Sequence, residues 1–81
     1  MKDFIEMTAD EIKNYNGPVY GYSAVFVKDG QRYATDGDHV SPEAAEQTFE
    51  EIKAERESNG WRLQYEVEYF QRTKKKKTDA V

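Results

Sequence analysis

The sequence predicts an α+β domain: a three-stranded antiparallel sheet with one long helix on one face and a short N-terminal helix, in the order α-β-β-α-β. Three observations predict it. Runs of β-branched and aromatic residues flank Asp29-Gly30, a long segment with helical spacing follows, and residues 61–72 alternate between apolar and polar side chains. The strand order stays open, because the last strand can pair with either arm of the hairpin.

A short helix is expected to begin at Thr8, after an extended lead-in over residues 1–7. Thr8 can cap the first amides, and Glu11, three residues on, can accept a bond from the Thr8 amide. Gly17-Pro18 ends this helix. At about two turns it needs packing against another element to be stable.

A hairpin is expected next, with strands from Val19 to Lys28 and from Gln31 to Thr35. Asp29-Gly30 favours a two-residue type I′ turn, which places Lys28 opposite Gln31. The period of two then sorts the side chains onto two faces. One face carries Tyr20, Tyr22, Ala24, Phe26 and Tyr33; the other carries Val19, Gly21, Ser23, Val25, Val27 and Ala34.

The main helix is expected over residues 41–60, after a loop with the sequence TDGDHV. Ser41 is its N-cap, Pro42 takes the first helical position, and Asn59-Gly60 ends it, with Trp61 folding back on the last turn. Its apolar positions form a narrow stripe, so the helix covers one sheet face and is otherwise exposed to solvent. The stripe consists of Ala45, Phe49 and Ile52, with Ala44 and Thr48 at its margin.

The charge is divided unevenly along the 81 residues. Residues 1–70 have a net charge of −8, and residues 71–81 have a net charge of +4, which together give the overall −4. We therefore expect a single α+β domain over residues 1–72 and a disordered basic tail over residues 73–81. The absence of cysteine and of a long apolar run favours a cytoplasmic protein without a membrane span or a signal peptide.

The aromatic side of the hairpin is the unusual feature of the sheet. Small residues on the opposite side leave room for a helix that carries Phe49 and Ile52, which would leave the aromatic side exposed. Exposed tyrosines suit a protein interface or a stacking platform for unpaired bases. Two alternatives remain open: the short first helix buries the aromatic residues with Phe4, Ile5 and Ile12, or the long helix packs on the aromatic side.

The long helix is strongly acidic. It carries six glutamates but only two cations, Lys53 and Arg56. The pairs Glu46–Glu50 and Glu51–Glu55 also place like charges one turn apart. A negative surface on a rigid helix can occupy a basic groove that normally holds phosphates. The alternative is a solvated face that keeps a small protein soluble. Asp36 and Asp38, in the preceding loop, are expected to extend the acidic patch.

Neither a metal site nor an active site is expected. Asp36, Asp38 and His39 do not match the spacing of a calcium loop, and one histidine without cysteine disfavours structural zinc. His39 has no cysteine partner, and no sequence pattern pairs it with Ser23 or Ser41. We therefore expect no enzyme activity and no cofactor.

Two resemblances bear on function. The segment EEIKAERESNGWRLQYEVEYFQRTKKK resembles the end of short bacterial domains of unknown function, which implies no activity. In size, acidity, lack of cysteine and strand-strand-helix-strand order, the chain is similar to small phage proteins that inhibit host machinery, including anti-CRISPR proteins. That resemblance implies an inhibitor but carries over no site residue.

The leading hypothesis is a non-enzymatic binding or inhibitor protein that engages a larger basic, nucleic-acid-handling protein. A single-stranded nucleic-acid-binding module is the alternative, with the aromatic face stacking bases and the lysine tail contacting phosphates. A homodimer through an uncovered sheet face or an edge strand is a third interpretation. The predicted partner-binding residues are Tyr20, Tyr22, Phe26, Tyr33, Asp36, Asp38, Glu43, Glu46, Glu50 and Glu51.

Overall fold

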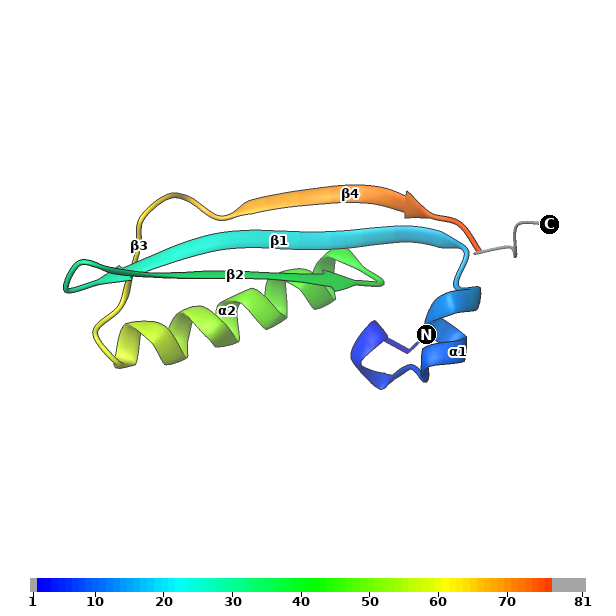
Figure 1. The fold of residues 1–81 in the computed structure, drawn as a ribbon, viewed down its shortest axis with the longest axis horizontal. Coiled ribbons are helices and arrows are strands. Elements are labelled where there is room, and N and C mark those ends of the chain that lie inside the picture. The colour runs from blue at the N-terminus through cyan, green and yellow to red at the C-terminus, as the bar shows by residue number, and fades with distance from the viewer. Residues whose placement is uncertain (1, 77–81) are drawn as a thin grey trace.

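The computed structural model describes residues 2–76 and has the expected α+β architecture (Figure 1). A helix lies along an antiparallel sheet, and a short helix lies at one end of the molecule. The elements are a 3-10 helix η1 (Phe4–Glu6), α1 (Ala9–Asn14), β1 (Gly17–Lys28), β2 (Gln31–His39), α2 (Pro42–Ser58), β3 (Arg62–Leu63) and β4 (Glu68–Lys74). Of the expected tail, residues 73 and 74 belong to β4, and residues 77–81 lie outside the described part of the chain.

The hairpin of β1 and β2 has the expected register. Lys28 pairs with Gln31, Phe26 with Tyr33, and both turn residues have positive φ, 48° at Asp29 and 79° at Gly30. The expectation of a loop after Thr35 is wrong, because β2 continues to His39. The polar run still forms a strand because its backbone pairs with β1 along its whole length.

β1 is the central strand of the sheet. β2 lies along one edge, while β3 and β4 both pair with the other edge of β1. The last strand was expected to be continuous, but its pairing with β1 is interrupted between Gln64, whose amide donates to the Val25 carbonyl at 2.9 Å, and Glu68. Leu63 pairs with Phe26 and Tyr69 pairs with Tyr22, so the chain advances six residues from Leu63 to Tyr69 while β1 advances only four. Because the insertion is two residues, Leu63 and Tyr69 still share a face.

Helix α2 has the expected ends. The Ser41 hydroxyl accepts a hydrogen bond from the Ala44 amide at 3.2 Å, and Pro42 occupies the first turn. At the other end the Trp61 amide donates to the Arg56 carbonyl at 2.9 Å, and Gly60 has a φ of 88°. This is a Schellman motif, which needs a left-handed residue at the position of Gly60. It turns the chain sharply from α2 into β3.

The expectation that α2 covers the Val-lined face is wrong: α2 packs on the aromatic face. Tyr22 and Phe26 are 3% and 0% exposed, and the ring of Phe49 lies 5.9 Å from that of Tyr22 and 6.3 Å from that of Phe26. Burying each large ring stabilises the fold by roughly 1.5–3 kcal/mol. Burying the glycine and serine residues of the opposite face would stabilise it less. Of the two alternatives left open by the sequence, the second is therefore adopted: the long helix packs on the aromatic side.

The N-terminal segment lies at the end of the sheet where β1 begins (Figure 1). The Thr8–Glu11 capping box is confirmed, with Thr8 accepting from the Glu11 amide and Glu11 accepting from the Thr8 amide. Phe4 and Ile12 line a pocket with Val19, and Ile5 is exposed. The first helix therefore does not bury the tyrosines of the hairpin.

In the described part of the chain, α2 is the helix that packs along the sheet, so most of the side away from α2 is uncovered. At one end of that side, Val19, Asp38 and Arg72 lie next to Phe4 and Ile12 of the N-terminal segment. We call the rest, from the hairpin turn to Phe70, the open face. It consists of Ser23, Val25 and Val27 from β1, Arg32, Ala34 and Asp36 from β2, Arg62 from β3, and Glu68 and Phe70 from β4. All of these side chains are exposed or half-buried.

Candidate functional site

The four aromatic residues predicted to contact a partner lie in or beside the core. Tyr22 and Phe26 are buried, whereas Tyr20 and Tyr33 are half-buried. They do share one sheet face, as expected, but α2 occupies it. Because buried rings cannot stack bases or anchor a partner, the prediction of an exposed aromatic platform is wrong.

Tyr33 has a local role at the C-terminal end of α2. The Arg56 guanidinium lies 3.6 Å from the centre of the Tyr33 ring and 5.7 Å from that of Trp61, and the two rings meet edge to face. Such a cation–π contact stabilises the packing of the helix end on the sheet. It also commits one of the two cations of α2 to the protein itself.

The predicted acidic residues divide between the two sides of the molecule. Glu43, Glu46, Glu50 and Glu51 are exposed on α2, whereas Asp36 and Asp38 pair with Ser23 and Gly21 and therefore face away from α2. Asp38 forms an ion pair of 2.6 Å with Arg72. The expectation that both aspartates extend the helix patch is therefore wrong.

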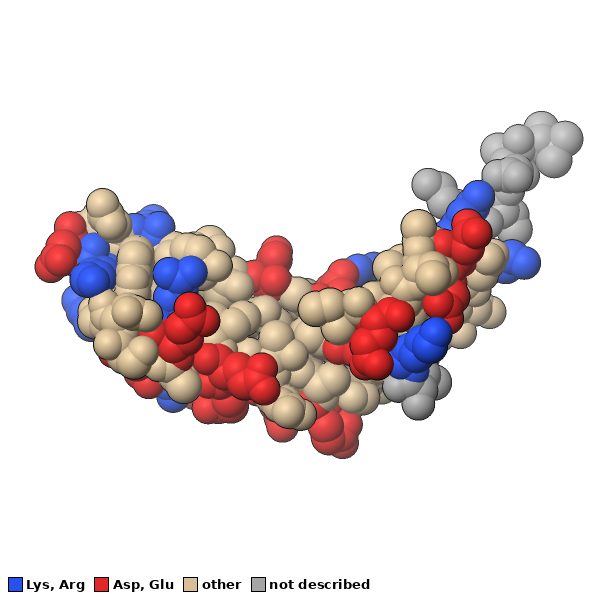
Figure 2. All heavy atoms as spheres, turned by 90° about the horizontal axis from the view of Figure 1, so that it is seen from below, with Lys and Arg blue, Asp and Glu red and all other residues tan. Residues whose placement is uncertain are grey.

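The glutamates of α2 form the acidic surface of the helix layer. Figure 2 shows acidic side chains across the middle of this side of the molecule and lysines and arginines near its two ends. Within residues 2–76, none of the three ion pairs involves a carboxylate of α2. Burial, and then the carboxylates of Glu46 and Glu50, raise the pKa of Tyr69, so this negative field reaches the neighbouring strand.

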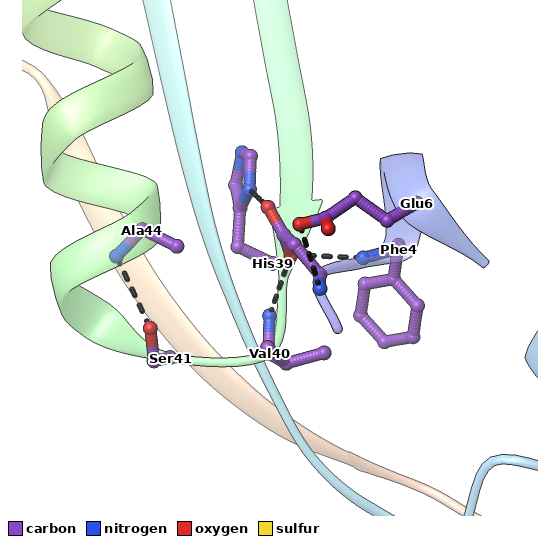
Figure 3. Close-up of polar contacts among 7 residues, drawn as sticks. Phe4, Glu6, His39, Val40, Ser41 and Ala44 are labelled. Carbon is purple, nitrogen blue, oxygen red and sulfur yellow. Dashed lines mark hydrogen bonds and ion pairs between the residues drawn. The ribbon is translucent and has the colours of Figure 1, made fainter. Parts of the chain in front are cut away.

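Asp3 and His39 form a second polar cluster, and Figure 3 shows that His39 lies close to the start of α2. Oδ2 of Asp3 lies 2.6 Å from Nδ1 of the buried His39, and Oδ1 accepts from the amides of Phe4 and Val40 at 2.9 and 3.0 Å. Burial would raise the pKa of Asp3, but these hydrogen bonds outweigh it and lower the pKa below its ordinary value.

This cluster connects the N-terminal segment to the junction of β2 and α2. Sequence reasoning placed His39 in a loop and missed Asp3, although Asp3 and Glu6 have the spacing of a capping box and do form one around η1. The His39 ring also stacks on Tyr22, with ring centres 5.9 Å apart. Because Asp3 bonds to both His39 and Val40, the cluster acts as a structural clamp between the start of the chain and the start of α2.

Replacing Asp3 with asparagine is expected to lower the free energy of unfolding by about 1–2 kcal/mol near pH 5 to 7. A carboxylate with a lowered folded pKa stabilises the fold above its ordinary pKa of 3.8 and loses that effect as the pH falls through the folded value. The difference between the two proteins should therefore shrink from pH 5 to pH 2.5. Thermal melts across this range, with Asp10→Asn as an exposed control, measure it.

Other kinds of site find little support in the described residues. Between residues 2 and 76, no group of three or more His, Cys, Asp or Glu side chains is arranged to hold a metal ion. In the same part of the chain, no helix combines the length and the apolar character that crossing a membrane requires. Comparison with protein-family models, with curated proteins and with solved structures gives no match.

Proposed function

We propose that the protein is a small non-enzymatic binding protein that inhibits or occupies a larger basic, nucleic-acid-handling partner through the exposed face of α2. The observation that carries the proposal is the set of six exposed glutamates on one rigid helix: Glu43, Glu46, Glu50, Glu51, Glu55 and Glu57. Their like-charge spacing destabilises the helix slightly. A basic groove on a partner would relieve that repulsion.

The geometry of the helix supports this function in two further ways. Caps at Ser41 and Gly60, together with the buried Phe49, hold α2 in one position, so its carboxylates are presented with little loss of conformational freedom on binding. Glu46 and Glu50 lie one turn apart beside Tyr69, whose exposed ring adds apolar contact area. An anti-CRISPR-type role belongs to the same proposal and is supported by size, charge and architecture.

Reversing three charges tests the proposal. The variant Glu46→Lys, Glu50→Lys, Glu51→Lys should lose a basic partner from a bacterial lysate, with affinity at least tenfold weaker, because the interaction becomes repulsive. Captured protein is measured at two salt concentrations and with added single-stranded and duplex nucleic acid as competitors. The wild-type capture should weaken at higher salt and be displaced by nucleic acid.

A matched control reverses three acidic groups away from α2, with Asp10→Lys, Glu66→Lys and Glu68→Lys. All three are exposed, and the change in net charge is the same. The control should retain the captured protein. If both triple variants bind equally, or if only the control loses binding, α2 is not the binding surface. Circular dichroism verifies that both variants are folded.

A further inference from the structure

We propose that the open face is the contact surface of a homodimer, in which two sheets stack with a two-fold axis level with Val25. The occupant is a second copy of this chain. The proposal rests on how charge is arranged on the open face and does not depend on the partner of α2.

Charges on the open face are sorted into two bands across the strands. Asp36 and Glu68 pair with Ser23, one on each side, so the level of Ser23 is acidic. Arg32 and Arg62 pair with Val27 in the same way, so the level of Val27 is basic. Residues paired directly across strands lie on the same face, so both bands belong to the open face.

The four charged residues have no partner within the described chain. None of Arg32, Arg62, Asp36 and Glu68 takes part in any side-chain hydrogen bond or ion pair found between residues 2 and 76. The two bands are four residues apart on β1, roughly 13 Å. That separation is too large for the bands to neutralise each other within one molecule.

A second copy neutralises both bands at once. The level of Val25 lies midway between the bands, and it carries only Val25 and Ala34 from β1 and β2. A two-fold axis at this level, between the sheets and perpendicular to the strands, places the acidic band of each copy on the basic band of the other. Asp36 then faces Arg32 of the second copy, and Glu68 faces Arg62. The same contact is made twice, as a two-fold interface requires.

The remaining features of the face fit this arrangement. Val25 and Ala34 meet their own counterparts on the axis. Tyr65, 63% exposed, and the exposed Glu66 line a depression with Ser23 and Val25, where Glu66 adds negative charge beside Glu68 of the acidic band. The sheet of the second copy ends at its Asp29-Gly30 turn, opposite Gly21. It therefore stops short of Val19, where Phe4 and Ile12 line the neighbouring pocket.

The size of the face sets the expected affinity. Three strands about 4.8 Å apart, contacting over about eight residues, bury on the order of 800–1,000 Å² in total. That is below the size of a typical stable interface, so we expect a weak dimer that dissociates on dilution. The ion pairs between the bands contribute more to the relative orientation of the two copies than to their affinity. Because salt screens these pairs, dimerisation should weaken at higher salt.

Two charge-reversed chains test the arrangement by sedimentation velocity from 5 to 500 μM. One carries Arg32→Glu and Arg62→Glu, which makes both bands acidic, and the other carries Asp36→Arg and Glu68→Arg, which makes both bands basic. Each alone should dimerise at least tenfold more weakly than the wild type. An equimolar mixture should form a heterodimer at least as tight as the wild-type dimer, because all four ion pairs are restored.

The control Lys13→Glu with Lys75→Glu reverses two exposed cations elsewhere and should dimerise like the wild type. The single variants Arg32→Glu and Asp36→Arg repeat the mixing experiment with smaller changes, in case a double variant folds poorly. A wild type that is monomeric at 500 μM overturns the proposal. So does a dimer that both double variants leave intact, or a mixture that does not associate.

Discussion

Replacing Phe49 with alanine is expected to lower the free energy of unfolding by about 3–5 kcal/mol. Phe49 is 2% exposed and contacts the rings of Tyr22, Phe26 and Tyr69, so its removal leaves a cavity between α2 and the sheet. A domain of this length has a total stability of roughly 4–12 kcal/mol. The variant should therefore be partly or wholly unfolded at room temperature, as measured by urea denaturation.

Phe70→Ala is the matched control, because the same atoms are removed from the other side of the sheet. Phe70 is 42% exposed, and its ring lies over Gly21 on the open face. We expect a loss of about 1 kcal/mol or less. Fluorescence of Trp61, the single tryptophan, provides a second probe at the end of α2. Equal losses for the two variants would mean that α2 does not cover the aromatic face.

Local signals in the sequence predict most of the elements. The Asp29-Gly30 turn determines the hairpin register, and the Thr8, Ser41 and Gly60 caps determine where the helices begin or end. Each of these features depends on hydrogen bonds or φ angles within about five residues. Such interactions are encoded next to one another in the chain, so they can be predicted without the fold.

The choice of buried face is not local. Alternation shows which side chains share a face, but both faces of β1 carry apolar residues, and either can accept a helix. The deciding contacts join residues far apart: Phe49 lies on Tyr22, and Tyr22 lies against Gly37. Gly37 belongs to a polar run that shows no strand signal, so the space for Tyr22 could not be predicted.

The candidate sites were predictable to different degrees. Helical spacing predicts that the glutamates of α2 are exposed, because the buried Ala45 and Phe49 face the sheet and the other side of the helix faces solvent. These glutamates include Glu43, Glu46, Glu50 and Glu51. Their role in binding a partner stays a prediction. The Asp3–His39 clamp joins residues 36 positions apart, and the charge bands of the open face require the pairing of β3 and β4 with β1. Neither follows from spacing along the chain.

Replacing Gly37 with valine is expected to lower the free energy of unfolding by about 2–3 kcal/mol, because the Tyr22 side chain crowds the space that a valine would occupy. A Cβ at this position would lie 3.0 Å from Cε1 and 3.1 Å from the hydroxyl oxygen of Tyr22. The ring cannot move aside, since it packs between Phe49 and His39. Ala34→Val, on the exposed side of the same strand, should be neutral or slightly stabilising, because valine favours strands.

A double-mutant cycle separates crowding from backbone effects at Gly37. In a Tyr22→Leu background the smaller side chain leaves room for the valine methyl groups, so Gly37→Val should cost at least 1 kcal/mol less than in the wild type. Urea denaturation of the four proteins gives this difference directly. Equal costs in the two backgrounds would mean that the ring of Tyr22 does not limit this position. The glycine would then be required by the strand itself, and Tyr22 would not pack against β2 as described.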